Sequence, residues 1–261
     1  MISVPEHSRE DAQRLFNRAF ALHHRDHDIA AAQTLYEQVI ARWPEHAQAF
    51  HSLGVIAYAQ GRPRDAIELL SRAISLQGSQ PVFHHSLAQA LRADGNTVDA
   101  LAALKRSVSL NPEFLGAWAA MAEIHYALNE VDEAAQAIGR VGELLSTIAV
   151  SYLKRGNALV LEKKYSEAVL AYRAGIDCNP YGWGLYYNLG NVLIAQREFA
   201  DAVACLSQAA KLSPEHAGIL VNLSNALWFC GNSGAALAAR EAALTLEPGI
   251  APRRFASNPL R

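Results

Sequence analysis

The chain has 261 residues, 51% of them hydrophobic, and its 23 Lys and Arg residues nearly balance 25 Asp and Glu residues for a formal net charge of −2. This composition excludes intrinsic disorder and a collagen-like fibre. So small a charge supplies no global field that would attract nucleic acid or an anionic membrane, and we expect neither as a partner. Helix formers dominate, which predicts an all-α fold.

No apolar run reaches the length of a membrane span, and the first ten residues, MISVPEHSRE, lack the basic and apolar regions of a secretory leader. The three cysteines, Cys178, Cys205 and Cys230, form no C-x-x-C pair, so they suggest neither a disulfide framework nor a zinc knuckle. A reducing compartment fits this pattern. We therefore expect a cytoplasmic protein.

A strict internal period organises the chain. Alanine recurs every 34 residues, at Ala32, Ala66, Ala100, Ala134, Ala168, Ala202 and Ala236. Twelve residues later, prolines that end a helix share a phase at Pro44, Pro112, Pro180, Pro214 and Pro248. A small residue such as Gly54 or Gly190 precedes the alanine by twelve positions. A period of this length is typical of stacked helical pairs that cannot bury their apolar faces alone.

Two segments carry a family resemblance most clearly: AFHSLGVIAYAQGRPRDAIELLSRAISL at 49–76 and YYNLGNVLIAQREFADAVACLSQAAKLSP at 186–214. Both resemble the tetratricopeptide repeat. The resemblance implies a right-handed α-solenoid of stacked helix–turn–helix repeats, in which small residues let the two helices of a repeat approach closely. Seven repeats are expected at 13–46, 47–80, 81–114, 115–148, 149–182, 183–216 and 217–250, after a lead-in at 1–12 and before a tail at 251–261.

Two places depart from the repeat pattern. In repeat 1, Phe20 stands where a small residue is expected, so the register there can slip by one. Between repeats 4 and 5, the segment LLSTIAV lacks the terminating proline and Arg155 replaces a leucine. A kink or an altered stacking angle is expected at that junction.

The sequence contains no catalytic or metal-binding signature such as H-E-x-x-H, the P-loop or G-x-S-x-G. The pairs Glu45-His46 and Glu215-His216 are interpreted as solvated turn residues. His23, His24 and His27 are interpreted as a polar interhelix turn in preference to a metal site. We expect no enzyme activity, no metal and no cofactor.

The resemblance also implies that first-helix residues line a concave groove. In the N-terminal half these residues are basic or histidine, and the candidates are Arg14, Arg18, His51, His85 and Arg92. They predict a preference for an acidic partner. Histidine near its usual pKa of about 6.5 gains positive charge as the pH falls, so this binding is expected to tighten below about pH 6.

In the C-terminal half the groove candidates are amides and aromatic residues. Asn188 and Asn222 share one repeat position, Asn157, Asn191 and Asn225 share another, and Tyr187 and Trp228 flank them. A side-chain amide offers a donor and an acceptor, so a ladder of amides can hold the backbone of an extended peptide. The segment NLGNVL resembles the repeats of the O-linked N-acetylglucosamine transferase, whose asparagine ladder holds peptides. The alternative for the second position is a hydrogen bond between repeats.

The leading hypothesis is a non-catalytic scaffold that binds a protein or peptide in the concave groove. The alternatives are the substrate-adaptor region of a glycosyltransferase-like enzyme and a self-assembling structural protein. The last predicted helix, AALAAREAALTLE at 235–247, is apolar around most of its circumference, which predicts docking of repeat 7 against a second copy or a partner, with Phe255 and Leu260 as a partial cover. The alternative is that an alanine-rich surface is tolerated because alanine exposes little area.

Overall fold

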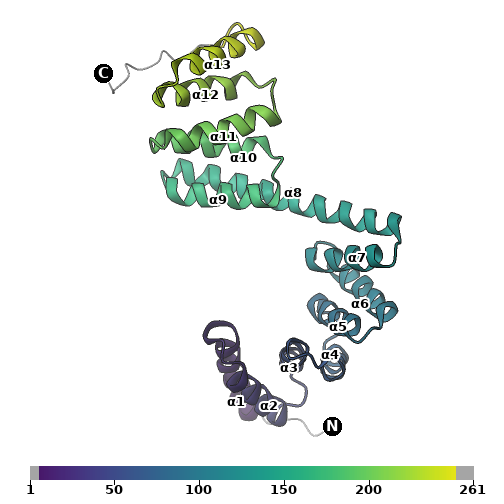
Figure 1. Cartoon of the computed structure of the whole chain (residues 1–261). Coiled ribbons are helices and arrows are strands. Elements are labelled where there is room, and N and C mark those ends of the chain that lie inside the picture. The colour runs from purple at the N-terminus through teal and green to yellow at the C-terminus, as the bar shows by residue number, and fades with distance from the viewer. Residues whose placement is uncertain (1–5, 251–261) are drawn as a thin grey trace. The chain divides into compact units, whose positions relative to one another are not determined.

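The computed structural model describes residues 6–250, which form helices and turns without a strand, so the all-α prediction is confirmed (Figure 1). In chain order the helices are α1 (Glu6–Ala21), the π-helical turn η1 (Leu22–Asp26), α2 (Ile29–Arg42), α3 (Ala47–Ala59), α4 (Pro63–Leu76), α5 (Pro81–Ala93), α6 (Thr97–Leu110), α7 (Leu115–Ala127), α8 (Val131–Leu161), α9 (Tyr165–Cys178), α10 (Trp183–Ala195), α11 (Phe199–Leu212), α12 (Ala217–Phe229) and α13 (Ser233–Leu246).

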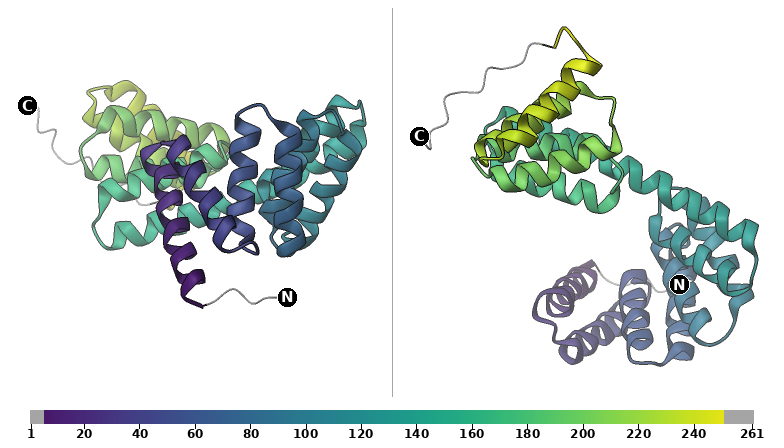
Figure 2. Two further views of the ribbon diagram at one scale, coloured as in Figure 1. Left: turned by 90° about the horizontal axis from the view of Figure 1, so that it is seen from below. Right: turned by 45° about the horizontal axis from the view of Figure 1, so that its top comes forward.

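The chain forms two compact units, an N-terminal unit that ends at Val141 and a C-terminal unit that begins at Gly142. In the N-terminal unit, α3 packs on α4 and α5 on α6, and α4 in turn packs on α5 (Figures 1 and 2). In the C-terminal unit, α10 packs on α11 and α12 on α13, and α11 packs on α12. Each unit is therefore a stack of helical hairpins, which is the packing of an α-solenoid.

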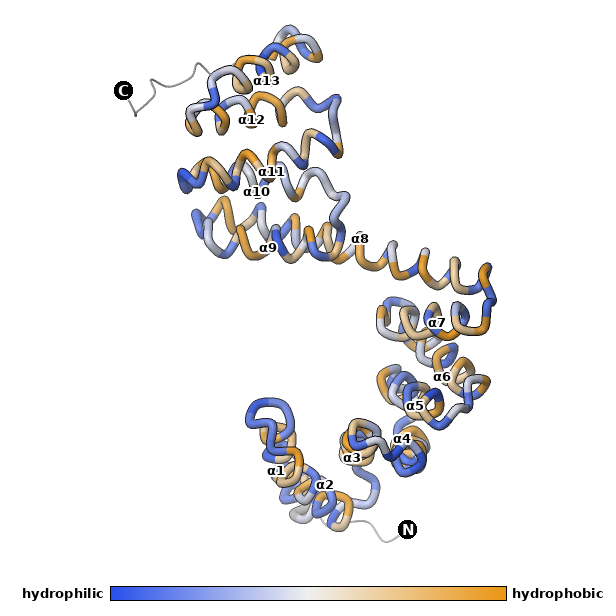
Figure 3. The backbone as a smooth tube through the Cα atoms, viewed as in Figure 1, coloured by the Kyte–Doolittle hydropathy of each residue, from blue (hydrophilic) through white to orange (hydrophobic). Residues whose placement is uncertain are grey.

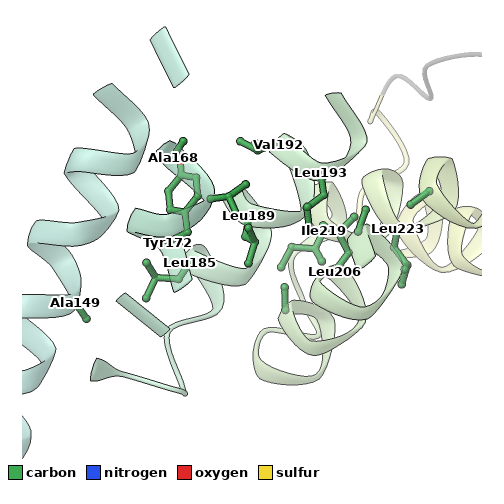
Figure 4. Packing of buried hydrophobic residues seen from close by; sticks show 14 residues of the cluster. Ala149, Ala168, Tyr172, Leu185, Leu189, Val192, Leu193, Leu206, Ile219 and Leu223 are labelled. Carbon is green, nitrogen blue, oxygen red and sulfur yellow. The ribbon is translucent and has the colours of Figure 1, made fainter. Parts of the chain in front are cut away.

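Small residues at the helix crossings hold each hairpin together. The seven periodic alanines are 0–4% exposed. In the partner helix, a Cβ atom on Gly190 of α10 would lie 2.6 Å from Cγ of Leu206 in α11. The core around this crossing contains Leu189, Leu206 and Ile219 (Figure 4). The backbones approach so closely that the two positions have no room for a larger side chain.

The turn inside every hairpin contains one residue in the left-handed region, always at the same phase of the repeat. These residues are His27 (φ 56°), Gly61 (72°), Gly95 (86°), Asn129 (60°), Lys163 (61°), Arg197 (65°) and Gly231 (80°). A residue with a Cβ atom adopts this conformation at a cost of about 1–2 kcal/mol. The conformation is kept whatever residue occupies the position, so helix packing imposes the turn geometry.

Repeat 1 differs from the sequence prediction in two respects. Helix α1 begins at Glu6, so part of the predicted lead-in at 1–12 is helical. Ala19 is fully buried while Phe20 is 50% exposed, so the small buried position is taken one residue early. The register of repeat 1 is therefore shifted, and the chain passes into the π-helical turn η1 directly after α1.

The junction of repeats 4 and 5 contains no turn. Helix α8 is continuous from Val131 to Leu161 and passes through the predicted boundary at 148–149 (Figure 1). The missing proline explains this, because nothing in the segment STIA stops a helix. One long helix serves as the second helix of repeat 4 and the first helix of repeat 5.

We expect Gly190→Ala to lower the free energy of unfolding by about 2 kcal/mol, because the new methyl group overlaps Leu206 and one of the helices must move. The control is Gly139→Ala in α8, where a Cβ atom would meet nothing within 4 Å. That change should stabilise the chain by up to about 1 kcal/mol through helix propensity. Urea unfolding followed by circular dichroism measures both, and equal effects of the two changes would contradict the close-packing argument.

We expect Arg197→Gly to raise the free energy of unfolding by about 0.5–1 kcal/mol, because glycine removes the left-handed strain and loses part of that gain through its greater freedom in the unfolded chain. The neighbouring change Gln196→Gly is the control, since Gln196, at the end of α10, has φ of −82° in the right-handed helical region and is already unstrained. It should be destabilising. A loss of stability on Arg197→Gly, measured in the same urea titrations, would show that the turn is not strained.

Candidate functional site

The asparagines predicted in the C-terminal unit come together in pairs that join neighbouring repeats. Nδ2 of Asn188 on α10 donates to Oδ1 of Asn157 on α8 at 2.9 Å. Nδ2 of Asn222 on α12 donates to Oδ1 of Asn191 on α10 at 2.7 Å. The two bonds repeat the same contact one period apart, so each first helix is tied to the first helix of the preceding repeat. The second asparagine position thus forms the inter-repeat hydrogen bond considered above, and its partner is the first position.

Two tyrosine hydroxyls complete these amide pairs. The Tyr172 hydroxyl donates to Oδ1 of Asn157 at 2.8 Å, and Nδ2 of Asn222 also donates to the Tyr187 hydroxyl at 3.2 Å. The carbonyl oxygens of Asn188 and Asn222 accept no hydrogen bond from the described residues. Both amides are thus fixed in orientation while each keeps an acceptor for another group.

Three rings gather beside the second amide pair. The ring of His216, in the turn before α12, lies 4.8 Å from that of Trp183 and 5.8 Å from that of Tyr187, centroid to centroid. Trp183 is 37% exposed. A Cβ atom on Gly218 would lie 3.1 Å from the His216 ring, so the glycine makes room for it. The cluster offers an apolar surface next to Asn222.

Trp183, His216 and Gly218 were not identified as site residues from the sequence. The interpretation of Glu215-His216 as solvated turn residues is wrong for the histidine, which is half-buried with a buried Nδ1 that has no partner among residues 6–250. It is also wrong for His46, which is 5% exposed and whose Nδ1 accepts from the Ala49 backbone N–H at 3.1 Å. The shared phase of His46 and His216 in the 34-residue period was the available signal.

The remaining C-terminal candidates, Asn225 and Trp228, both lie on α12 (Ala217–Phe229). Asn225 is half-buried on α12 and makes no side-chain hydrogen bond within the described part of the chain. Trp228 is half-buried on the same helix. Near the end of α12, Phe229 stacks on Phe199 of α11 at 4.7 Å, so it belongs to the packing between helices.

The N-terminal unit contains a cavity of about 420 Å³ on the side of its first helices α1, α3 and α5. Of the five N-terminal candidates named above, His51 lines it. The His51 ring stacks on Phe83 at 4.6 Å and its Nε2 lies 2.9 Å from the Ser86 hydroxyl. The full lining is Phe16, Asn17, Phe20, Gln48, His51, Ser52, Gln80, Val82 and Phe83.

The N-terminal candidates form a weaker positive patch than the sequence predicted. Arg14 is paired with Asp11, and Arg92 contacts Glu123 at 2.6 Å. Arg18 is exposed. His85 packs against Phe114 at 5.1 Å. Two of the three arginine charges are therefore partly neutralised within the unit.

The predicted tightening of binding below pH 6 is wrong for the two histidines of this patch. Burial lowers the pKa of His51 to about 4. Burial also lowers the pKa of His85, and the nearby Arg92 charge adds to this effect. Because the neutral ring is favoured in both cases, each histidine gains its positive charge at a lower pH than an unperturbed histidine does.

The last helix, α13, presents part of the apolar surface expected from the sequence. Ala236 and Ala243 are fully buried, whereas Leu237 is 50% and Leu246 is 46% exposed. Phe255 and Leu260, the predicted cover, lie outside the described residues. Association of repeat 7 with a second copy stays a prediction.

Among residues 6–250, no three His, Cys, Asp or Glu side chains come close enough to hold a metal ion. His23 and His24 belong to η1, where their rings stack at 4.5 Å. No helix within the same residues combines the length and apolar character of a membrane span.

The buried His51 should make stability depend on pH. Its pKa is lowered from 6.5 to about 4 in the folded chain, so the unfolded chain takes up a proton first as the pH falls. Stability is complete above pH 6.5 and falls between pH 6.5 and 4, by at most about 3 kcal/mol from this residue. In urea unfolding at a series of pH values, His51→Gln should lose less stability over this window than the wild type. Parallel curves for the two proteins would contradict the assignment to His51.

Comparison with curated proteins finds no match. Among solved structures, an O-GlcNAc transferase of Thermobaculum terrenum is 22% identical, with 46% of this chain and 23% of that chain covered and a TM-score of 0.44. The chain thus spans about a quarter of that protein. A tetratricopeptide repeat protein of Parabacteroides merdae is 17% identical, with 91% and 94% covered and a TM-score of 0.48. MamA is 17% identical, with 85% and 91% covered and a TM-score of 0.34.

Sequence models of protein families show to which family the chain belongs. Models described as tetratricopeptide repeat match residues 18–81, 91–155 and 183–216, which together make up more than half of the chain and fall in both units. Five of the seven periodic alanines that close the helical hairpins lie within the matched segments. The chain belongs to the tetratricopeptide repeat family.

Proposed function

We propose that this chain is a non-catalytic binding protein whose C-terminal unit holds an extended segment of a partner protein across α8, α10 and α12. Tetratricopeptide repeats generally mediate protein–protein interaction. The observation that carries the proposal is the repeated amide pair, Asn157 with Asn188 and Asn191 with Asn222, which keeps an acceptor available at each step.

The amide pairs suit a polypeptide backbone. Each of the carbonyl oxygens of Asn188 and Asn222 can accept from a backbone N–H of a bound segment, whatever the side chains of that segment are. Since hydrogen bonds between repeats already fix the two side chains, binding costs little additional side-chain entropy. Recognition of this kind is tolerant of sequence.

The ring cluster beside the second pair adds selectivity. Trp183, Tyr187 and His216 present aromatic surface next to Asn222, and Tyr187 is hydrogen-bonded to that asparagine. A bulky apolar side chain of the bound segment would pack there while its backbone pairs with the amides. We therefore expect bound segments to share one apolar residue and little else.

For the N-terminal unit we propose a modest preference for an acidic partner. Helices α3 and α5 contain no Asp or Glu, and Arg18 on α1 makes no ion pair within residues 6–250. The paired states of Arg14 and Arg92 keep this preference weak. Salt should therefore weaken binding only slightly.

The test is selection of binders from a random dodecapeptide library on the intact chain, followed by measurement of their dissociation constants. We expect Asn188→Ala/Asn222→Ala to weaken binding of the selected peptides by about 30-fold, since each lost hydrogen bond to the backbone is worth about 1 kcal/mol. Tyr187→Ala should weaken the binding of peptides that contain an apolar residue more than the binding of other peptides. Fluorescence anisotropy with labelled peptides measures both effects.

The matched control is Gln208→Ala/Lys211→Ala on α11, the second helix of the same repeat. It should leave affinity within twofold of the wild type. Because the asparagines also tie repeats together, urea unfolding of each variant shows whether the chain is still folded at the assay temperature. Unchanged affinity in a folded Asn188→Ala/Asn222→Ala protein would make the amide pairs purely structural.

A further inference from the structure

We propose that the cavity between α1, α3 and α5 of the N-terminal unit is a second binding site, which takes one aromatic side chain from an extended segment of a partner protein. The cavity belongs to the unit that ends at Val141. The inference therefore does not depend on the amide pairs of the C-terminal unit.

The cavity arises where this chain departs from the repeat pattern. A small residue is expected at position 20, and Phe20 is found there instead. The shifted register of α1 buries Ala19 in its place and leaves Phe20 half exposed, where its ring becomes one wall of the cavity. Phe16 and Phe20 lie on α1 and Phe83 on α5, so aromatic walls come from the two outer helices. Figure 3, in which the backbone is coloured by the hydropathy of each residue, shows apolar residues on each of these helices.

The shape and walls match an aromatic side chain. A volume of about 420 Å³ lies within the range of ligand cavities and exceeds one large side chain, which leaves space for adjoining backbone. Aromatic rings pair favourably at centroid separations of about 4.5–7 Å, and the His51 ring already stacks on Phe83 at 4.6 Å. An incoming ring would continue this stack or meet the Phe20 ring, which is accessible.

The charge of the lining selects against ionised groups. No Asp, Glu, Lys or Arg is among the lining residues. The titratable member, His51, faces Phe83 and the Ser86 hydroxyl, and burial keeps it neutral at ordinary pH. An ionised side chain would lose its hydration without gaining a partner here.

The polar part of the lining favours a peptide over a lipid chain. Asn17, Gln48 and Gln80 bring three side-chain amides to one cavity. Amides can both donate to and accept from a peptide backbone, whereas an alkyl chain offers them no hydrogen bond. The occupant that meets both the rings and the amides is an aromatic residue together with its own backbone.

The test uses the full chain and three probes, N-acetylated and C-amidated Ser-Gly-Ser-Gly-X-Gly-Ser-Gly-Ser with X as Phe, Ala or Glu. Methyl NMR locates binding, with the Val82 methyls as the reporter and the Val98 methyls as the reference. Anisotropy of labelled probes gives the affinities. We expect the Phe probe to shift the Val82 signals in a saturable manner, and to bind at least tenfold more tightly than the Ala and Glu probes.

A matched pair of variants tests the location. Val82 and Val98 are each the second residue of their helices, α5 and α6, and are 41% and 79% exposed, so glutamate is tolerated at both positions. Val82→Glu should weaken the Phe probe at least tenfold, and Val98→Glu should change its affinity less than twofold. Repeating both measurements with Asn188→Ala/Asn222→Ala separates this site from the proposed C-terminal one.

Four results would overturn the proposal. The first is equal affinity for the Phe and Ala probes, and the second is retention of full affinity in the Val82→Glu chain. The third is a shift of the Val82 methyl signals by octyl glucoside at a lower concentration than the Phe probe needs for the same shift. That result would assign the cavity to an alkyl chain. Absence of saturable binding of the Phe probe up to millimolar concentration also counts against it.

Discussion

The close crossing of two helices in each hairpin is the contact on which the rest of the structure depends. Alanine on one helix and a small residue on the other bring the backbones together, as at Ala202 and Gly190. This crossing fixes the angle of the hairpin and, through it, the left-handed residue in each turn. It also determines which face of every first helix points away from its partner, and the two proposed binding surfaces are built on those faces.

Much of this followed from the period of the sequence. A residue that must be small for steric reasons leaves the same mark in every repeat, so the helical pairs could be predicted from the alanines. The pairing of Asn188 and Asn222 with neighbouring repeats was open to prediction for the same reason, because stacking aligns equal positions. The choice between a structural and a ligand role was not, since one amide can serve both.

The failures concern side-chain contacts that the repeat pattern does not record. His46 and His216 follow prolines and were interpreted as solvated, yet rings such as Trp43 and Trp183 cover them. His51 has its pKa set by burial against residues more than 30 positions away, which no local pattern records. The cavity beside it depends on the one-residue shift in α1. This small change in packing has a large effect on the shape of the surface. Composition indicated the charge balance correctly. The ion pairs that weaken the basic patch can be identified only from interatomic distances in the structure.

Helix α8 places an unusual constraint on the evolution of this chain. Loops between helices absorb insertions and deletions at little energetic cost, and a whole repeat can be gained or lost without changing the phase of its neighbours. Inside a continuous helix, one added residue rotates the side chains that follow it by about 100° about the helix axis, so their buried face loses its register with the helix that covers it. The 31 residues of α8 are therefore a segment in which composition can drift while length cannot.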